Sequence, residues 1–173
     1  MDYGKRILED RSKKTCLEIA RFIGDDEGRF AGLVDAFFNA EGNEQNWLMW
    51  VISHTVERNP RLVMAHLDKF VHHLDPGHSG AVNRGIVRML RDTRVLPEEL
   101  AGEIYTKCFD LLQDSGQAIA VRAFSIKVLA RIACHHPELK TELIPLLYDL
   151  YTYSEKALFV SARDALRELG EKV

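Results

Sequence analysis

The chain has 173 residues, of which 46% are hydrophobic, and it carries a formal net charge of −3. This length and apolar fraction predict a single domain with a continuous core. The acidic balance argues mildly against a general nucleic-acid binder, because proteins that hold phosphate backbones are usually basic. No stretch approaches the roughly 20 apolar residues of a membrane span, and the charged first residues do not form a secretory signal. We therefore expect a cytoplasmic protein with no membrane association.

Apolar residues at three- and four-residue steps predict helices along the whole chain. The predicted helices span residues 5–23, 27–40, 43–58, 60–74, 80–93, 97–113, 115–136, 137–153 and 155–169. Asn43, Ser115 and Ser154 are candidate N-terminal caps, since their side-chain oxygens can accept from free amides of a first turn. Gly42 suits the left-handed residue that follows a helix.

Residues 117–151 form the clearest unit, two apolar helical stripes with a break at Pro137. A proline pushes the preceding residue out of the helical region, yet it is tolerated as the first residue of the next helix. The same pattern recurs upstream, and Leu62, Leu100 and Leu139 are spaced 38 and 39 residues apart. A period near forty, made of two helices, is typical of an α-solenoid.

The segment VRAFSIKVLARIA, residues 121–133, resembles the first helix of a HEAT-like repeat. The resemblance covers roughly residues 43–169. Together with the period it implies an all-α, right-handed α-solenoid of about four antiparallel helix pairs plus a C-terminal capping helix. The expected organisation is one domain over 1–173, with an atypical leading cap pair (1–42), three repeats (43–153) and a capping helix (154–173). Such repeats usually serve as binding scaffolds.

Histidines and cysteines are the first candidates for a metal site. Adjacent histidines on a helix point about 100° apart, so the pairs at 72–73 and 135–136 each offer at most one ligand per face. We therefore predict solvated histidines at helix ends, with no metal and no cofactor. The three cysteines, at 16, 108 and 134, are scattered and lie in apolar contexts, which predicts reduced core thiols.

An arginine row is the second candidate. Arg84, Arg88 and Arg91 recur at helical spacing and Arg94 follows, and Arg122 and Lys127 are expected to extend the row in the next unit, although the slot of Arg122 holds Asn83 one unit earlier. Such a row can grip an acidic peptide or a phosphate backbone. The alternative is a solvated outer face paired with Asp92, Glu98 or Glu99, and the acidic balance of the chain favours that alternative.

Aromatic residues are the third candidate. Trp47 is expected in the core, whereas Trp50 stands where later units hold basic residues and is expected to be partly exposed. Trp50 is the best single candidate for a binding anchor. Tyr148 and Tyr151 are expected to add a polar-tipped patch.

The sequence contains no phosphate-binding glycine loop, no CxxC pair, no HExxH and no Gly-x-Ser-x-Gly, so no catalytic residue is assigned. The resulting hypothesis is a non-catalytic scaffold that binds a protein through the surface of the second helices, near residues 62–74, 98–112 and 139–151. The alternative is a nucleic-acid-binding or DNA-repair-like HEAT module that uses the arginine row. Homodimerisation through the second-helix surface stays open.

Overall fold

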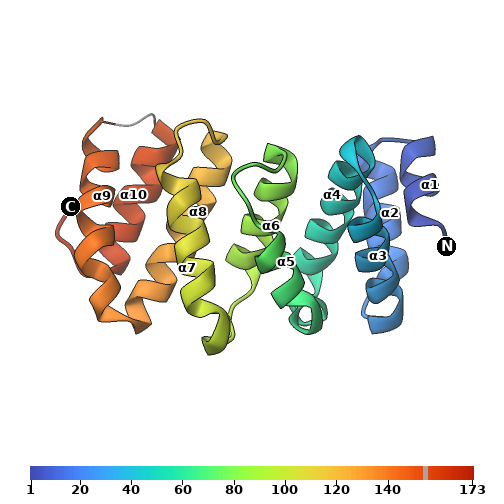
Figure 1. Cartoon of the computed structure of the whole chain (residues 1–173), viewed down its shortest axis with the longest axis horizontal. Coiled ribbons are helices and arrows are strands. Elements are labelled where there is room, and N and C mark those ends of the chain that lie inside the picture. Colours follow the sequence, from blue (N-terminus) through green and yellow to red (C-terminus); the bar gives the residue numbers. More distant parts are fainter. Residues whose placement is uncertain (154–155) are drawn as a thin grey trace. The chain divides into compact units, whose positions relative to one another are not determined.

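The computed structural model describes residues 1–153 and 156–173, and within them the chain is all-α, as predicted, with no strand (Figure 1). It falls into two compact units: unit 1 comprises residues 1–74 and 81–95, and unit 2 comprises residues 75–80 and 96–173. The predicted cap Ser154 and the first residue of the predicted last helix lie outside the described residues.

The N-terminal segment of unit 1 differs from the prediction. The single helix expected over residues 5–23 is wrong, because the segment forms two helices, α1 (Tyr3–Glu9) and α2 (Lys13–Ile23). Asp10 adopts extended backbone and accepts hydrogen bonds from the hydroxyls of Ser12 and Thr15. Ser12 in turn accepts from the Thr15 amide at 3.2 Å, which caps α2. These short polar side chains compete with the helical hydrogen bonds and so end α1.

Helix α4 (Gly42–Arg58) packs against α1, α2 and α3 (Glu27–Asn39), so it forms the centre of unit 1 (Figure 1). Its buried side chains include Leu48, Met49 and Ile52. Gly42 has a φ of 56°, the left-handed conformation expected of it, but it opens α4 after an extended Ala40. The predicted cap by Asn43 is wrong, since α4 starts without a side-chain cap.

The helix predicted over residues 60–74 is only half α-helical. Pro60 starts it, as predicted, but Pro60–His66 form a 3₁₀ helix, η1, and α5 covers only Leu67–His73. His66, with φ −128° and ψ 2°, interrupts the helical path between the two. The apolar stripe nevertheless faces the core, with Leu62, Leu67 and Phe70 buried. Helix α6 (Gly80–Asp92) follows and buries Ile86 and Leu90.

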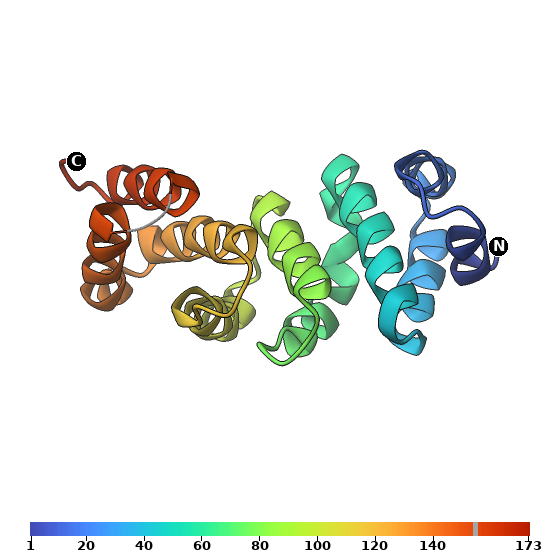
Figure 2. The same cartoon turned by 90° about the horizontal axis from the view of Figure 1, so that it is seen from above.

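Unit 2 is arranged around α8 (Ile119–His135), which packs against α7 (Glu98–Gln113), α9 (Lys140–Tyr153) and α10 (Lys156–Glu168) (Figure 2). A short 3₁₀ helix, η2 (Pro137–Leu139), joins α8 to α9. The predicted start of α8 at Ser115 is wrong. The Asp114 carboxylate accepts from the Gly116 amide and the Gln117 side chain, both at 2.8 Å, and this local turn displaces the cap.

The forty-residue pattern is reflected in the burial of the first helices. Pro60, Pro97 and Pro137 each stand at the start of a second helix. The aligned positions of α6 and α8 are buried in both helices: Val82 and Val121, Val87 and Ile126, Met89 and Val128, Leu90 and Leu129. Cys134 departs from its prediction. It is exposed, and its thiol lies 3.7 Å from the Glu168 carbonyl oxygen of α10, whereas Cys16 and Cys108 are core residues as expected.

Candidate functional site

Three ring side chains follow one another along α4. The rings of Trp47 and Trp50 have centroids 5.2 Å apart, and those of Trp50 and His54 are 5.8 Å apart. Both tryptophans are half-buried. The partial exposure predicted for Trp50 is therefore confirmed, while the core position predicted for Trp47 is wrong, because each ring covers the other instead of entering the core.

An ion-pair network joins α4 to α6 next to these rings. The Glu57 carboxylate accepts from Arg88 Nη2 at 2.8 Å, and its Oε2 lies 3.1 Å from His54 Nδ1. Asp92 lies 2.7 Å from Arg91 Nη2 and 3.8 Å from Arg88 Nε. Two members of the predicted arginine row are thus already paired with carboxylates, as the solvated-face alternative expects. Arg84 is exposed and has no ion-pair partner among the described residues.

The electrostatics of this network keep Glu57 ionised and His54 neutral. Burial raises the pKa of Glu57, but Arg88 and His54 together outweigh it, so the pKa of that carboxyl lies below its usual range. Burial lowers the pKa of His54, and the nearby Arg88 charge lowers it further, although the hydrogen bond to Glu57 opposes both. The buried thiol of Cys16 has a pKa raised to about 12, which leaves it protonated and unreactive.

The imidazole of His54 is expected to titrate below the roughly 6.5 of a free histidine. Because its folded pKa is depressed, the stability that neutral His54 contributes is present above the unfolded pKa and is lost as the pH falls. An Arg88→Gln change removes a positive neighbour and should raise the pKa of His54. Proton NMR of the ring Cε1–H signals measures the pKa of His54 in the parent protein and in the Arg88→Gln variant. The signal of His54 is identified by its absence from the His54→Gln variant. A midpoint for His54 at or above that of free histidine contradicts the expectation.

A groove lies beside the network at the C-terminal ends of α4 and α6. It has a volume of about 600 Å³ and is lined by Glu57, Arg58, Pro60, Asp92, Arg94 and Val95. Sequence reasoning placed Arg94 in the arginine row but missed the groove. The i, i+3 spacing of His54 and Glu57 could have predicted their contact on α4. The ion pair between Glu57 and Arg88 appears only once α6 packs on α4.

The candidates in unit 2 take part in contacts within the fold. Arg122 Nε donates to the Leu112 carbonyl at 2.9 Å, which ties α8 to the end of α7. Tyr148 donates to Glu171 at 2.9 Å, and Tyr151 stacks on Phe159 with centroids 4.9 Å apart. Lys127 alone is exposed and has no polar partner among the described residues.

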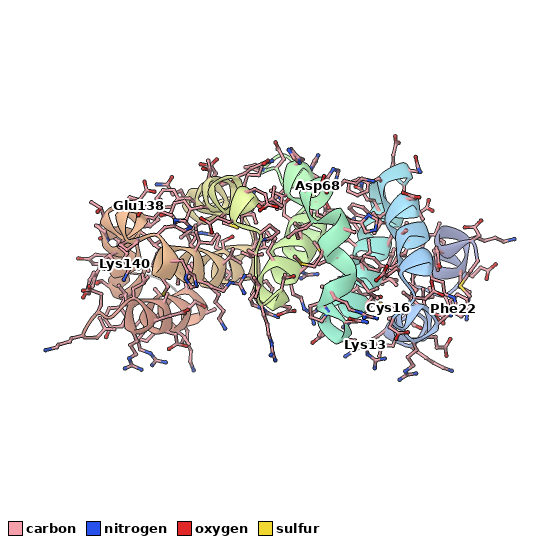
Figure 3. The ribbon with its side chains drawn as sticks, turned by 90° about the horizontal axis from the view of Figure 1, so that it is seen from below. Lys13, Cys16, Phe22, Asp68, Glu138 and Lys140 are labelled. Atoms are coloured by element: carbon pink, nitrogen blue, oxygen red, sulfur yellow. The ribbon has the colours of Figure 1, made fainter. Side chains whose placement is uncertain are left out.

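A second hollow of unit 1 lies between α3 and α5. It measures about 450 Å³ and is lined by Phe38, Asp68, Lys69, His72 and His73. Figure 3 shows Asp68 on one side of unit 1 and Lys13 on the opposite side. His72 is exposed near the end of α5, as predicted, and its Nδ1 lies 2.7 Å from the Asp68 carbonyl oxygen one turn earlier.

The remaining histidines differ in their surroundings. The prediction of a solvated ring is wrong for His73, whose ring packs edge-on against Phe37 at 5.5 Å and Phe38 at 5.4 Å between centroids. His136 Nε2 lies 3.2 Å from the Glu98 carboxylate in unit 2. Among the described residues, no group of three metal-ligating side chains converges.

This arrangement, paired helices with buried stripes at a forty-residue period, agrees with the comparison with known families. The model of the HEAT repeat domain matches residues 3–167. The chain belongs to the HEAT repeat family. Neither curated proteins nor solved structures give a significant match.

Membership of the HEAT repeat family establishes the α-solenoid class of fold, and HEAT repeats are generally scaffolds for protein interactions. No helix in the described part of the chain is both long and apolar enough to cross a bilayer. Six of the eight sequence-predicted site residues lie on the first helices α4, α6 and α8, and only Tyr148 and Tyr151 lie on a second helix, α9. The predicted site residues are therefore not all on the surface that was expected to bind.

Proposed function

We propose that this HEAT repeat protein is a non-catalytic scaffold that binds a partner protein through the surface of its second helices. The observation that carries the proposal is the hollow of about 450 Å³ between α3 and α5. Its lining combines an aromatic ring, Phe38, with the charged groups of Asp68 and Lys69. Met64, on η1 and therefore just before α5 in the sequence, leaves 41% of its surface exposed. Apolar anchors surrounded by polar groups are the usual composition of a protein-binding patch.

A protein partner is favoured over nucleic acid because several basic residues of the predicted row already have partners within the fold. Arg88 and Arg91 are paired with Glu57 and Asp92, and Arg122 is held by a backbone carbonyl. A phosphate backbone would have to displace these partners, and the net charge of −3 adds repulsion at long range.

Site-specific photocrosslinking tests the proposal. Benzoylphenylalanine at Met64 or at Lys69 places the reactive group on the second-helix surface, and the same amino acid at Arg21, exposed on α2, is the control. After irradiation in native lysate, both test positions are expected to yield the same crosslinked partner, and the control position none.

The specificity of that crosslink decides the outcome. The product formed from position 64 should be reduced about tenfold by a Lys69→Glu change, which reverses a charge in the hollow. A product of twice the chain mass, formed by the purified protein alone, identifies the partner as a second copy. The same product from all three positions, or none from any, contradicts the proposed surface.

A further inference from the structure

The groove at the ends of α4 and α6 has a charge imbalance. Glu57 and Asp92, its two carboxylates, are each held within 2.8 Å of a guanidinium, Arg88 and Arg91 respectively. Arg58 and Arg94, which also line the groove, are exposed and have no ion-pair partner among the described residues. Each carboxylate of the lining is thus already paired with an arginine outside it, which leaves the positive charges of Arg58 and Arg94 in excess. His54 adds no charge, since burial lowers its pKa.

The groove also presents an apolar contact. Val95 leaves 76% of its surface exposed, an unusual exposure for a β-branched apolar residue, and the ring of Pro60 lies in the same lining. Covering such a side chain releases water and contributes about 25 cal/mol for each Å² of apolar surface buried. A volume of about 600 Å³ is in the range of known ligand pockets, about 300–1,000 Å³, and is large enough for a few side chains.

We propose that this groove binds an acidic segment of a partner protein. Carboxylates of the segment would pair with Arg58 and Arg94, whose forked guanidinium groups suit bidentate contacts, and an apolar side chain of the segment would cover Val95. A basic segment would be repelled by the exposed guanidinium groups of Arg58 and Arg94. This site lies at the helix ends and is separate from the second-helix surface, so it does not depend on the function proposed above.

The acidic segment fits better than a nucleic acid for two reasons. Glu57 leaves 48% of its side chain exposed at the groove, so its carboxylate would repel a phosphate that must lie close to it. A single peptide carboxylate can select the unpaired arginines, whereas a phosphate backbone carries a charge at every nucleotide. The apolar contact at Val95 also has no counterpart in backbone binding.

Fluorescence anisotropy with short labelled peptides tests the proposal. The probes are a serine–glycine peptide with two glutamates around one central phenylalanine, the same peptide with glycine in place of the phenylalanine, the counterparts with glutamine or lysine in place of the glutamates, and an oligothymidylate of equal length. The phenylalanine-containing acidic peptide is expected to bind, and the double variant Arg58→Glu/Arg94→Glu to weaken it at least about tenfold. A Val95→Ser change should weaken it about threefold, and only for the peptide with phenylalanine.

A matched control separates the groove from general electrostatics. The double variant Arg11→Glu/Arg21→Glu changes the net charge equally. Arg11 lies between α1 and α2 and Arg21 lies on α2, and both are exposed with no ion-pair partner in the described part of the chain. It should leave affinity within about twofold. Circular dichroism confirms that both variants stay folded, and Arg58→Gln/Arg94→Gln replaces the first variant if it does not.

Three results would overturn the inference: no saturable binding of either acidic peptide, an equal loss in the control variant, or tighter binding of the oligothymidylate than of the peptides. The last result would identify a polyanion surface instead. Photocrosslinking from positions 64 and 69 is expected to be unchanged in the Arg58→Glu/Arg94→Glu variant. A negative result for peptide binding in the groove therefore leaves the proposed partner binding at the second-helix surface untouched.

Discussion

Replacing Phe37 by alanine is expected to destabilise unit 1 by about 3–5 kcal/mol, the usual range for truncating a fully buried aromatic ring. Phe37 on α3 has no exposed surface, and its ring lies 4.9 Å from Phe38, 5.6 Å from Phe70 and 5.5 Å from His73, measured between centroids. The change removes contacts to α5 as well as to α3 itself. The resulting cavity cannot collapse easily, because rings surround it from both helices.

Urea denaturation followed by tryptophan fluorescence measures this loss directly. The chain has two tryptophans, and both lie on α4 in unit 1, so the signal reports the unit that contains Phe37. Phe22→Ala is the matched control, since the Phe22 ring is 41% exposed and its main contact is the guanidinium of Arg29, 4.3 Å above the ring. That change is expected to destabilise by about 1 kcal/mol or less. Equal effects from the two variants would contradict the packing described here.

The second large effect is expected from Gly85→Leu, which should destabilise the protein by about 3 kcal/mol. A Cβ atom added at Gly85 would collide with Cγ of Met49 and lie 3.1 Å from its Cε, so α6 touches α4 through a glycine. Met49 is itself 1% exposed, so its side chain would have to shift within the core. The gain in helix propensity, about 1 kcal/mol, does not offset this collision.

Gly102→Leu is the control for the same substitution within a helix. Gly102 lies in α7, is exposed, and a Cβ added there would meet nothing within 4 Å. We expect this change to be neutral or to stabilise by up to about 1 kcal/mol. Adding Met49→Ala should recover part of the loss caused by Gly85→Leu, because it vacates the space the leucine needs. Circular dichroism during urea denaturation reports both units, and a Gly85→Leu variant as stable as Gly102→Leu would refute the close approach.

The interpretation of the arginine row illustrates the limits of sequence analysis for the site. Helical spacing predicted that Arg84, Arg88 and Arg91 share a face, and the choice between a binding row and a solvated, paired face was left to composition. The decisive partner of Arg88 is Glu57, 31 residues away on α4. No local pattern connects these two residues. Only the packing of α6 beside α4 brings them to 2.8 Å.

The sequence by itself determined most of the elements and their order, because the spacing of apolar residues and the position of each proline are local properties. Hydrophobic stripes predicted the buried sides of α6 and α8, and Pro60, Pro97 and Pro137 predicted where second helices begin. Tertiary structure decided the rest. The 3₁₀ path of η1, the exposure of Cys134 and Trp47, and the groove beside Val95 all depend on neighbouring helices. Burial, pairing and concavity arise only when distant segments meet, and no periodicity within one helix encodes them.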